Sequence, residues 1–180
     1  MQPHPWHDLT SGPASPDRLN AVIEIPRGSR NKYELDKETG FFLFDRLLYS
    51  AVHYPGDYGL IPRTLAEDGD PLDVVVMVTE PTFSGCLMVV RPLGVFIMRD
   101  EKGLDEKLLA VPVRDPLYDR YTELEHAPPH FLREVEHFFG MYKELEGHAT
   151  ELLGWHDRTR AAAIIRECER RYADAYPSGK

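Results

Sequence analysis

Three aspartates lie within six residues in the run Asp68-Gly-Asp-Pro-Leu-Asp73. Two ionised carboxylates about 4 Å apart repel by roughly 4 kcal/mol at an effective dielectric near 20. Such crowding is tolerated when the acids are solvated, share a proton or bind a cation. Oxygen ligands favour magnesium, manganese or calcium over zinc, and the ligand spacing and closing Glu of an EF-hand calcium loop are missing. Taken alone, the run is compatible with a metal site or with a solvated acidic turn.

Other charged positions are less specific. The run Asp100-Glu-Lys-Gly-Leu-Asp-Glu-Lys107 is typical of a charged hairpin turn. In Lys32-Tyr-Glu-Leu-Asp36, strand alternation places Lys32 and Glu34 on one face, which is the common pattern of a half-buried strand. Glu24 lies inside the apolar stretch Val22-Ile-Glu-Ile-Pro26, where an unpaired buried charge would be costly. The alternative for Glu24 is a side chain that faces solvent.

Phenols and cations complete the candidate set. Tyr54 and Tyr58 flank a Gly/Pro turn, where their hydroxyls could donate to phosphate oxygens or where their rings could simply pack in the core. Arg46 ends an apolar strand, and Tyr142-Lys143 lies at the edge of the apolar face of a predicted helix. Both cations could instead be surface residues whose stems cover apolar neighbours.

The spacing of apolar residues predicts the strands and helices that must position these residues, and this spacing changes along the chain. Short apolar stretches punctuated by Gly, Pro and Asp predict strands at 21–25, 32–36, 41–48, 73–79, 87–98 and 107–113. Helical spacing of apolar residues begins at residue 128, where two prolines suit a first turn, and Gly147 suits the helix end. A second helix is predicted at about 157–176. The expected face of this helix carries Ala161, Ile164, Ile165, Cys168 and Tyr172. Strands followed by two helices predict a mainly β protein with α (α+β), a small barrel with helices packed outside it.

Length and composition bound the remaining possibilities. The 180 residues fit one domain, predicted at 19–177, and residues 1–18 form an N-terminal arm that we expect to be loosely ordered. No apolar run reaches the roughly 20 residues of a membrane span, and no signal peptide is recognisable, so the cytoplasm is the expected location. Two cysteines give neither a disulfide framework nor a metal-ligand spacing. The net charge of −9 argues against a nucleic-acid partner, yet bound metal ions could still attract an anion.

Together and in this order, the segments resemble the family I soluble inorganic pyrophosphatases. The series comprises Ile23-Glu-Ile-Pro, Lys32-Tyr-Glu, Asp45-Arg46, Tyr54-Pro with Tyr58-Gly, Asp68-Gly-Asp-Pro-Leu-Asp-Val74, Asp100 with Asp105-Glu-Lys107, Tyr142-Lys143 and Gly154-Trp155. The Asp-x-Asp-Pro-x-Asp element resembles the family signature, and the resemblance covers about residues 19–176. It implies a five-stranded barrel of the oligonucleotide-binding (OB) type, several Mg²⁺ ions with Mn²⁺ or other divalent metals as substitutes, and pyrophosphate as substrate.

The resemblance also implies roles. Asp68, Asp73 and Asp105 would hold the tightest metal ion, and Asp73 would hold a second. A water bridging these two ions would attack pyrophosphate to give two phosphates, with Asp70 as general base oriented by Tyr58.

The remaining positions would bind later metals or the substrate. Asp100 and Asp105 would take a metal that arrives with pyrophosphate, and Glu34 would reach another through water. Phosphate oxygens would be bound by Lys32, Arg46, Tyr58, Tyr142 and Lys143, of which Lys32, Arg46 and Tyr58 are also counted as catalytic. Supporting positions would be Glu24, Tyr54 and Lys107.

The resemblance further implies a homo-oligomer, with a hexamer as the first expectation. Many bacterial relatives have a histidine directly before the Tyr-Lys pair, where this chain has Met141, while His137 lies in the matching helix. Two other functions stay open at this point. One is a metal-dependent hydrolase of nucleoside triphosphates, for which no base-binding segment is recognisable, and the other is a non-catalytic barrel that binds oligonucleotides or metal.

Overall fold

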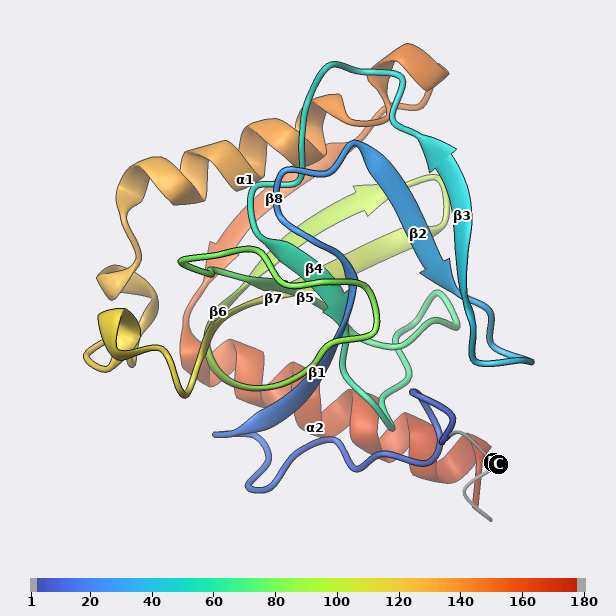
Figure 1. Ribbon diagram of the computed structural model, residues 1–180, viewed down its shortest axis with the longest axis vertical. Coiled ribbons are helices and arrows are strands. Elements are labelled where there is room, and N and C mark those ends of the chain that lie inside the picture. Colours follow the sequence, from blue (N-terminus) through green and yellow to red (C-terminus); the bar gives the residue numbers. More distant parts are fainter. Residues whose placement is uncertain (1–2, 178–180) are drawn as a thin grey trace.

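The computed structural model describes residues 3–177 of the chain (Figure 1). Within this range the backbone forms eight strands, two α-helices and three short 3₁₀ turns. The strands are β1 (Leu19–Ile25), β2 (Asn31–Leu35), β3 (Phe42–Leu47), β4 (Asp57–Leu60), β5 (Asp73–Val76), β6 (Leu87–Asp100), β7 (Gly103–Pro112) and β8 (Glu151–His156). The helices are α1 (Pro129–Met141) and α2 (Arg158–Ala175).

Five of the strands close into a ring. The order is β1-β4-β5-β7-β6, and β6 returns to pair with β1, so each of these strands has a neighbour on both sides. β8 adds to the outer side of β6, while β2 and β3 form a separate hairpin beside the ring. The predicted fold, a mainly β protein with a closed five-stranded structure of the OB type and packed helices, is confirmed.

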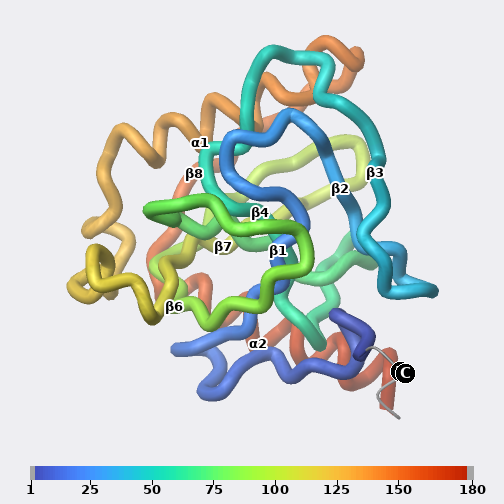
Figure 2. Tube along the Cα trace, in the orientation of Figure 1, coloured from blue at the N-terminus to red at the C-terminus, as the bar shows by residue number. Residues whose placement is uncertain are grey.

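The two helices cover opposite faces of the curved sheet (Figures 1 and 2). Side chains alternate along a strand, so Val74 and Val76 of β5 pack in the cluster that contains Ile164 of α2. Val75 points the other way and packs in the cluster that contains Phe139 of α1. β5 is therefore buried on both faces, as its continuous apolar sequence predicts.

Two ring-associated strands were not predicted. β4 lies in a segment with the composition of a turn, yet Gly59 is needed there because a Cβ atom would come within 2.1 Å of the Val22 carbonyl oxygen of β1. β8 pairs with β6 through a register shift between Ile97 and Met98, so its residues show no regular alternation. Both strands are held by partners distant in sequence, which a local pattern does not record.

The first helix is shorter than predicted. α1 ends at Met141, and the chain continues through Tyr142 and Lys143 into a 3₁₀ turn over 144–146. Gly147, with φ of 81°, ends this 3₁₀ turn instead of the α-helix. As a result Leu145 is exposed, although helical spacing had placed it on the apolar face. Neither helix in residues 3–177 has an apolar stretch long enough to cross a bilayer.

The N-terminal arm is packed against the rest of the protein over the residues that the structure describes. The expectation of a loosely ordered arm is therefore wrong for these residues. Met1 and Gln2 lie outside the described residues. The Trp6 side chain is 2% exposed and its indole N–H donates to the Thr64 carbonyl at 2.8 Å. Its ring also contacts Tyr172 and Tyr176 near the end of α2. One large apolar side chain thus fixes a segment whose composition resembles a linker.

We expect Trp6→Ala to lower the free energy of unfolding by about 3–5 kcal/mol, because it empties a buried site the size of an indole ring. Urea denaturation followed by far-UV circular dichroism measures this change. Phe83→Ala is the matched control, since that aromatic side chain is 66% exposed and its loss should change the free energy by about 0.5 kcal/mol or less. Equal effects of the two variants would contradict the packed arm.

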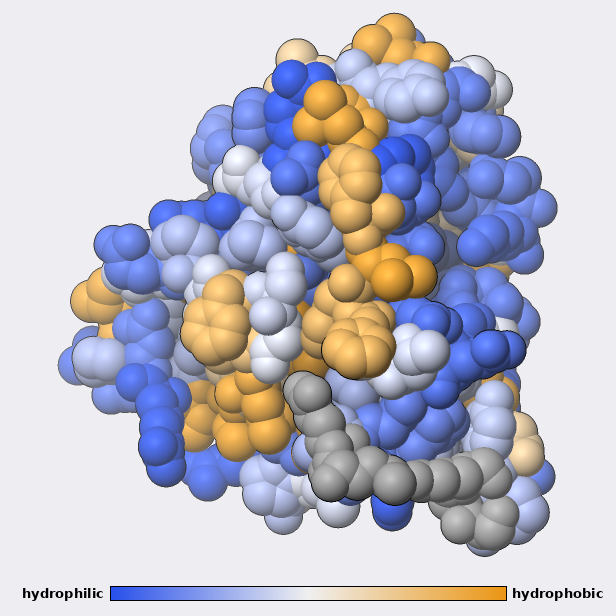
Figure 3. Space-filling view, turned by 45° about the vertical axis from the view of Figure 1, so that its right-hand side comes forward, coloured by the Kyte–Doolittle hydropathy of each residue, from blue (hydrophilic) through white to orange (hydrophobic). Residues whose placement is uncertain are grey.

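The hairpin exposes an apolar band on the face that Figure 3 brings forward. The exposed side chains on and next to β3 are Phe41, Leu43, Phe44, Leu47 and Tyr49. Large contiguous apolar patches of this kind usually mark contact surfaces.

Candidate active site

A cleft of about 640 Å³ opens between the ring and the β2–β3 hairpin. Every site residue predicted from the sequence lines this cleft except Tyr54. The cleft-lining members are Glu24, Lys32, Glu34, Arg46, Tyr58, Asp68, Asp70, Asp73, Asp100, Asp105, Lys107, Tyr142 and Lys143. They come from the seven strands β1 to β7, from the loop between β4 and β5 and from the end of α1, so the fold gathers residues that span 120 positions of the chain.

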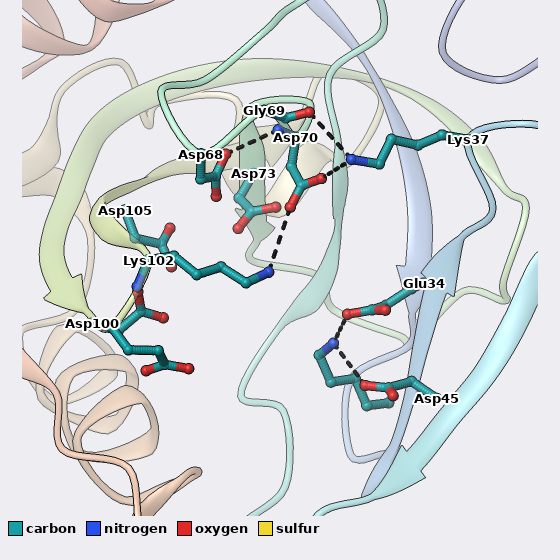
Figure 4. Close-up of polar contacts among 12 residues, drawn as sticks. Glu34, Lys37, Asp45, Asp68, Gly69, Asp70, Asp73, Asp100, Lys102 and Asp105 are labelled. Carbon is teal, nitrogen blue, oxygen red and sulfur yellow. Dashed lines mark hydrogen bonds and ion pairs between the residues drawn. The ribbon is translucent and has the colours of Figure 1, made fainter.

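The acidic loop between β4 and β5 is a tight turn with its own hydrogen bonds. The Ala66 N–H donates to the Asp70 carbonyl at 2.8 Å, and the Asp70 N–H donates to the Asp68 carboxylate at 3.0 Å. Gly69 has φ of 86°, a conformation that favours glycine and turns the chain between the two aspartates. Both carboxylates therefore face the cleft together with Asp73 and Asp105 (Figure 4).

Strand register brings the next group together. β5 and β7 are parallel neighbours in which Asp73 lies opposite Lys107, and Asp105 lies two residues earlier on the same face of β7. The buried Lys107 ammonium donates to Asp73 at 2.7 Å and to Asp105 at 2.9 Å. Although burial lowers the pKa of Lys107, these carboxylates raise the pKa well above its usual range. Lys107 remains charged and holds the two acids in place.

Tyr58 contacts a different aspartate from the one expected. Its hydroxyl donates to Asp73 and accepts from Lys107 at 2.9 Å, whereas the resemblance implied that it would orient Asp70. The reason is register, because Tyr58 on β4 lies beside β5 while Asp70 lies in the loop before it. Burial, followed by the Asp73 charge, raises the pKa of the Tyr58 hydroxyl well above its usual range, so the phenol remains a hydrogen-bond donor.

Glu24 is buried and does not face solvent. Its carboxylate accepts a hydrogen bond from the Leu35 N–H of β2 at 2.9 Å, which ties the hairpin to β1. Burial, and then the negative charge of Asp73, raises the pKa of Glu24 to about 8. This carboxyl group is therefore the member of the cleft most easily kept in its protonated form.

The cations on the wall of the cleft that the β2–β3 hairpin forms are paired with acids. Lys32 of β2 lies opposite Arg46 of β3, and its ammonium is 3.0 Å from the Asp45 carboxylate. Arg46 is 2.8 Å from Glu146 in the turn after α1. These pairs present two cations side by side on the hairpin wall of the cleft.

The turn after α1 supplies the other predicted pair. Lys143 is 2.8 Å from Asp100 at the end of β6, and the adjacent Tyr142 is buried at the base of the cleft. Burial alone would raise the pKa of Asp100, but the hydrogen bond from Lys143 lowers it overall. Tyr54 does not reach the cleft and packs against Phe138, with ring centroids 4.6 Å apart.

The structure adds cleft residues that the sequence did not single out. They are Lys37, Glu101, Lys102, Glu146 and His148. Glu101 and Lys102 belong to the charged run 100–107, and Lys37 follows the run 32–36. Their proximity in sequence to predicted site residues could therefore have identified these three. Glu146 and His148 reach the cleft only because α1 ends early.

The donor set suits a hard divalent cation. Burial, with added repulsion from Asp70 and Asp105, raises the pKa of Asp68. Burial also raises the pKa of Asp73 despite the opposing charge of Lys107. Crowded carboxylates with raised pKa values gain stability from a bound cation, and all the donors are oxygens. Within residues 3–177 no three His, Cys, Asp or Glu side chains lie in an arrangement that could hold a metal ion. Lys107 is paired with both Asp73 and Asp105, so a cation held by these two acids would require their side chains or that of Lys107 to rotate.

Comparison with known proteins gives one consistent answer. A family model described as inorganic pyrophosphatase matches residues 21–173. The inorganic pyrophosphatase of Methanosarcina mazei is 51% identical over 153 residues, covering 85% of this chain and 90% of that protein. The inorganic pyrophosphatase of Synechocystis sp. is 47% identical over 167 residues, covering 92% and 99%. The crystal structure of the Thermus thermophilus inorganic pyrophosphatase superposes with a TM-score of 0.90 at 43% identity, covering 93% of this chain and 98% of that one. The chain belongs to the inorganic pyrophosphatase family of hydrolases.

Proposed function

We propose that this protein hydrolyses inorganic pyrophosphate to two phosphates with Mg²⁺ as cofactor. The observation that carries the proposal is the convergence of the acidic loop, the Asp73–Lys107–Asp105 group and the hairpin cations on one cleft. This convergence occurs in a chain that belongs to the inorganic pyrophosphatase family.

Charge in the cleft explains why a cofactor is needed. Nine Asp and Glu side chains line it, against six Lys and Arg side chains, so acids outnumber cations even when Glu24 is protonated. The acids are Glu24, Glu34, Asp68, Asp70, Asp73, Asp100, Glu101, Asp105 and Glu146; the cations are Lys32, Lys37, Arg46, Lys102, Lys107 and Lys143. A multiply charged anion would be repelled from this surface unless divalent cations bind first.

Three carboxylates are the proposed holders of the tightest cation, namely Asp68, Asp73 and Asp105. Asp100 and Glu34, on opposite sides of the cleft, would hold further ions. Bound magnesium would supply positive charge beside the phosphoryl oxygens and make the attacking water more acidic. Mn²⁺ has the same preference for oxygen donors and is the expected substitute.

Asp70 is the proposed general base. Its side chain is 39% exposed and faces the cleft from the loop, so a water molecule can reach it. Negative charge that develops on the phosphoryl oxygens would be stabilised by fixed donors on the opposite walls. Those donors are Lys32, Arg46, Tyr142 and Lys143.

The supporting positions act through these residues. Lys107 and Tyr58 hold Asp73, Glu24 ties the hairpin to the ring, and Tyr54 packs beneath Tyr58 with ring centroids 5.4 Å apart. Tyr58 is therefore proposed as a positioning residue, whose hydroxyl would donate to substrate only if it released Asp73.

Phosphate release separates the proposed function from its alternatives. With magnesium present, we expect pyrophosphate to be hydrolysed with a kcat/KM at least roughly a hundredfold above that for ATP, because the charged groups that line the cleft would bind phosphate oxygens and offer the nucleoside of ATP no comparable contact. A colorimetric phosphate assay with pyrophosphate, ATP and no substrate makes the measurement. Preference for ATP would indicate a nucleoside triphosphate hydrolase, and no release from either substrate would indicate a non-catalytic binding protein.

A homo-oligomer, with a hexamer as the first expectation, and a cytoplasmic location both remain predictions. The apolar band on β3 supports self-association, and His137 and Met141 are exposed on α1 where a second copy could contact them.

A further inference from the structure

Two lysines approach Asp70 from different turns (Figure 4). The Lys37 ammonium, on the turn between β2 and β3, donates to Asp70 Oδ1 and to the Gly69 carbonyl at 3.2 Å. The Lys102 ammonium, on the turn between β6 and β7, lies 4.0 Å from Asp70 Oδ2. Each carboxylate oxygen of the proposed general base thus has a cation beside it, and neither lysine was among the site residues predicted from the sequence.

The backbone of each turn is fixed by an aspartate. The Asp36 side chain accepts from the Glu38 N–H at 3.2 Å, and the carbonyl of Lys37 itself is 3.2 Å from the His4 ring. On the other turn, the Asp100 side chain accepts from the Lys102 N–H at 2.8 Å. The point from which each lysine side chain extends is therefore held in place.

The tips of these lysines are free to move. The Lys37 and Lys102 side chains are 47% and 64% exposed, whereas Lys107 is 3% and Lys143 is 13% exposed. Exposed ion pairs contribute about 0–1 kcal/mol, so the contact with Asp70 is easily exchanged for a stronger one. Both lysines line the cleft, and a pyrophosphate anion that enters it carries more negative charge than one carboxylate.

We propose that Lys37 and Lys102 are additional substrate contacts whose ammonium groups leave Asp70 when pyrophosphate enters and donate to its oxygens. Substrate arrival then has two effects: the anion gains two charge-assisted hydrogen bonds, and the partly exposed Asp70 oxygens become more open to water. This inference rests on the proposed function, since it takes pyrophosphate as the entering anion.

Steady-state kinetics of Lys37→Met, Lys102→Met and the double variant test the exchange. We expect KM for pyrophosphate to rise about tenfold in each single variant, because the loss of one charge-assisted contact lowers affinity by about tenfold. In the double variant, which loses both contacts, KM should rise about a hundredfold. The kcat value should stay within about threefold. Calorimetric titration with inorganic phosphate in magnesium buffer should show a similar loss of affinity, and Lys37→Arg should restore most of it.

Arg170→Met is the matched control, because it removes one positive charge from an equally exposed site on α2 and should change neither KM nor phosphate affinity. A fall in kcat at constant KM would mean that the lysines only orient Asp70, and unchanged KM and phosphate affinity would show that they do not contact substrate; either result overturns the proposal. Hydrolysis by the unmodified protein is measured in the same assay. If it is absent, the proposed function fails by itself, and the phosphate titrations still decide the role of the lysines.

Discussion

Replacing Asp70 by asparagine should lower kcat by about 10²–10⁴ while most of the magnesium affinity remains. The amide cannot accept a proton as a base, and the Asp70 carboxylate is paired with Lys37 and Lys102, not with the acids proposed to hold the tightest cation. Steady-state phosphate release gives kcat, and calorimetric titration gives the magnesium affinity. The substitution keeps the shape of the side chain, so the loop that carries it should retain its hydrogen bonds.

Asp73→Asn is the informative comparison. Asp73 accepts from both Lys107 and Tyr58 at the centre of the cleft, so its charge is part of the proposed metal site. We expect this variant to lose magnesium affinity as well as activity. Asp174→Asn on the exposed side of α2 is the control for removal of a negative charge and should behave as the unmodified protein. Equal loss of magnesium by the Asp70 and Asp73 variants would refute the proposed division of roles.

Removal of divalent metal should abolish phosphate release, and added Mg²⁺ should restore it. Without metal, the excess of Asp and Glu over Lys and Arg in the cleft repels the substrate. The measurement is phosphate release after treatment with EDTA, after passage through a metal-free column, and after stepwise addition of MgCl₂ or MnCl₂.

Thermal unfolding provides a second readout that does not depend on catalysis. Binding of magnesium at a hundred times its Kd should stabilise the folded protein by about 2.7 kcal/mol, and the melting temperature should rise accordingly. Asp73→Asn should show a smaller rise than Asp70→Asn. Full activity in rigorously metal-stripped buffer would rule out the proposed cofactor.

Most of the fold could be predicted from the strand and helix patterns of the sequence. The apolar face predicted for the second helix is the one that α2 buries, from Ala161 to Tyr172. The buried strand after the acidic loop was predicted because its continuous apolar sequence is typical of a strand covered on both faces. β4 and β8 were missed since each depends on pairing with strands far away in the sequence. The packing of the arm was missed because it depends on Trp6 meeting α2 and the segment before the acidic loop.

The sequence by itself determined which residue types are available for chemistry and in what order. Three crowded aspartates, a second acidic run and four cations were each compatible with an oxygen-ligand metal site or a phosphate contact, and equally with solvated turns and surface charges. Charge repulsion and ligand preference, which are properties of the side chains themselves, limited the possible metals, and the order of the segments gave the family resemblance that implied metal ions and an anionic substrate. The gathering of these residues in one cleft followed from the family resemblance, not from any local pattern.

Only the tertiary structure decided which charges pair with each other. Tyr58 bonds to Asp73 instead of Asp70 because β4 and β5 are neighbours in register. Arg46 meets Glu146 because α1 ends at Met141 and the following turn folds back over the hairpin. The contact between Arg46 and Glu146 joins residues 100 positions apart. Strand register and helix ends set such contacts through packing that no short stretch of sequence contains.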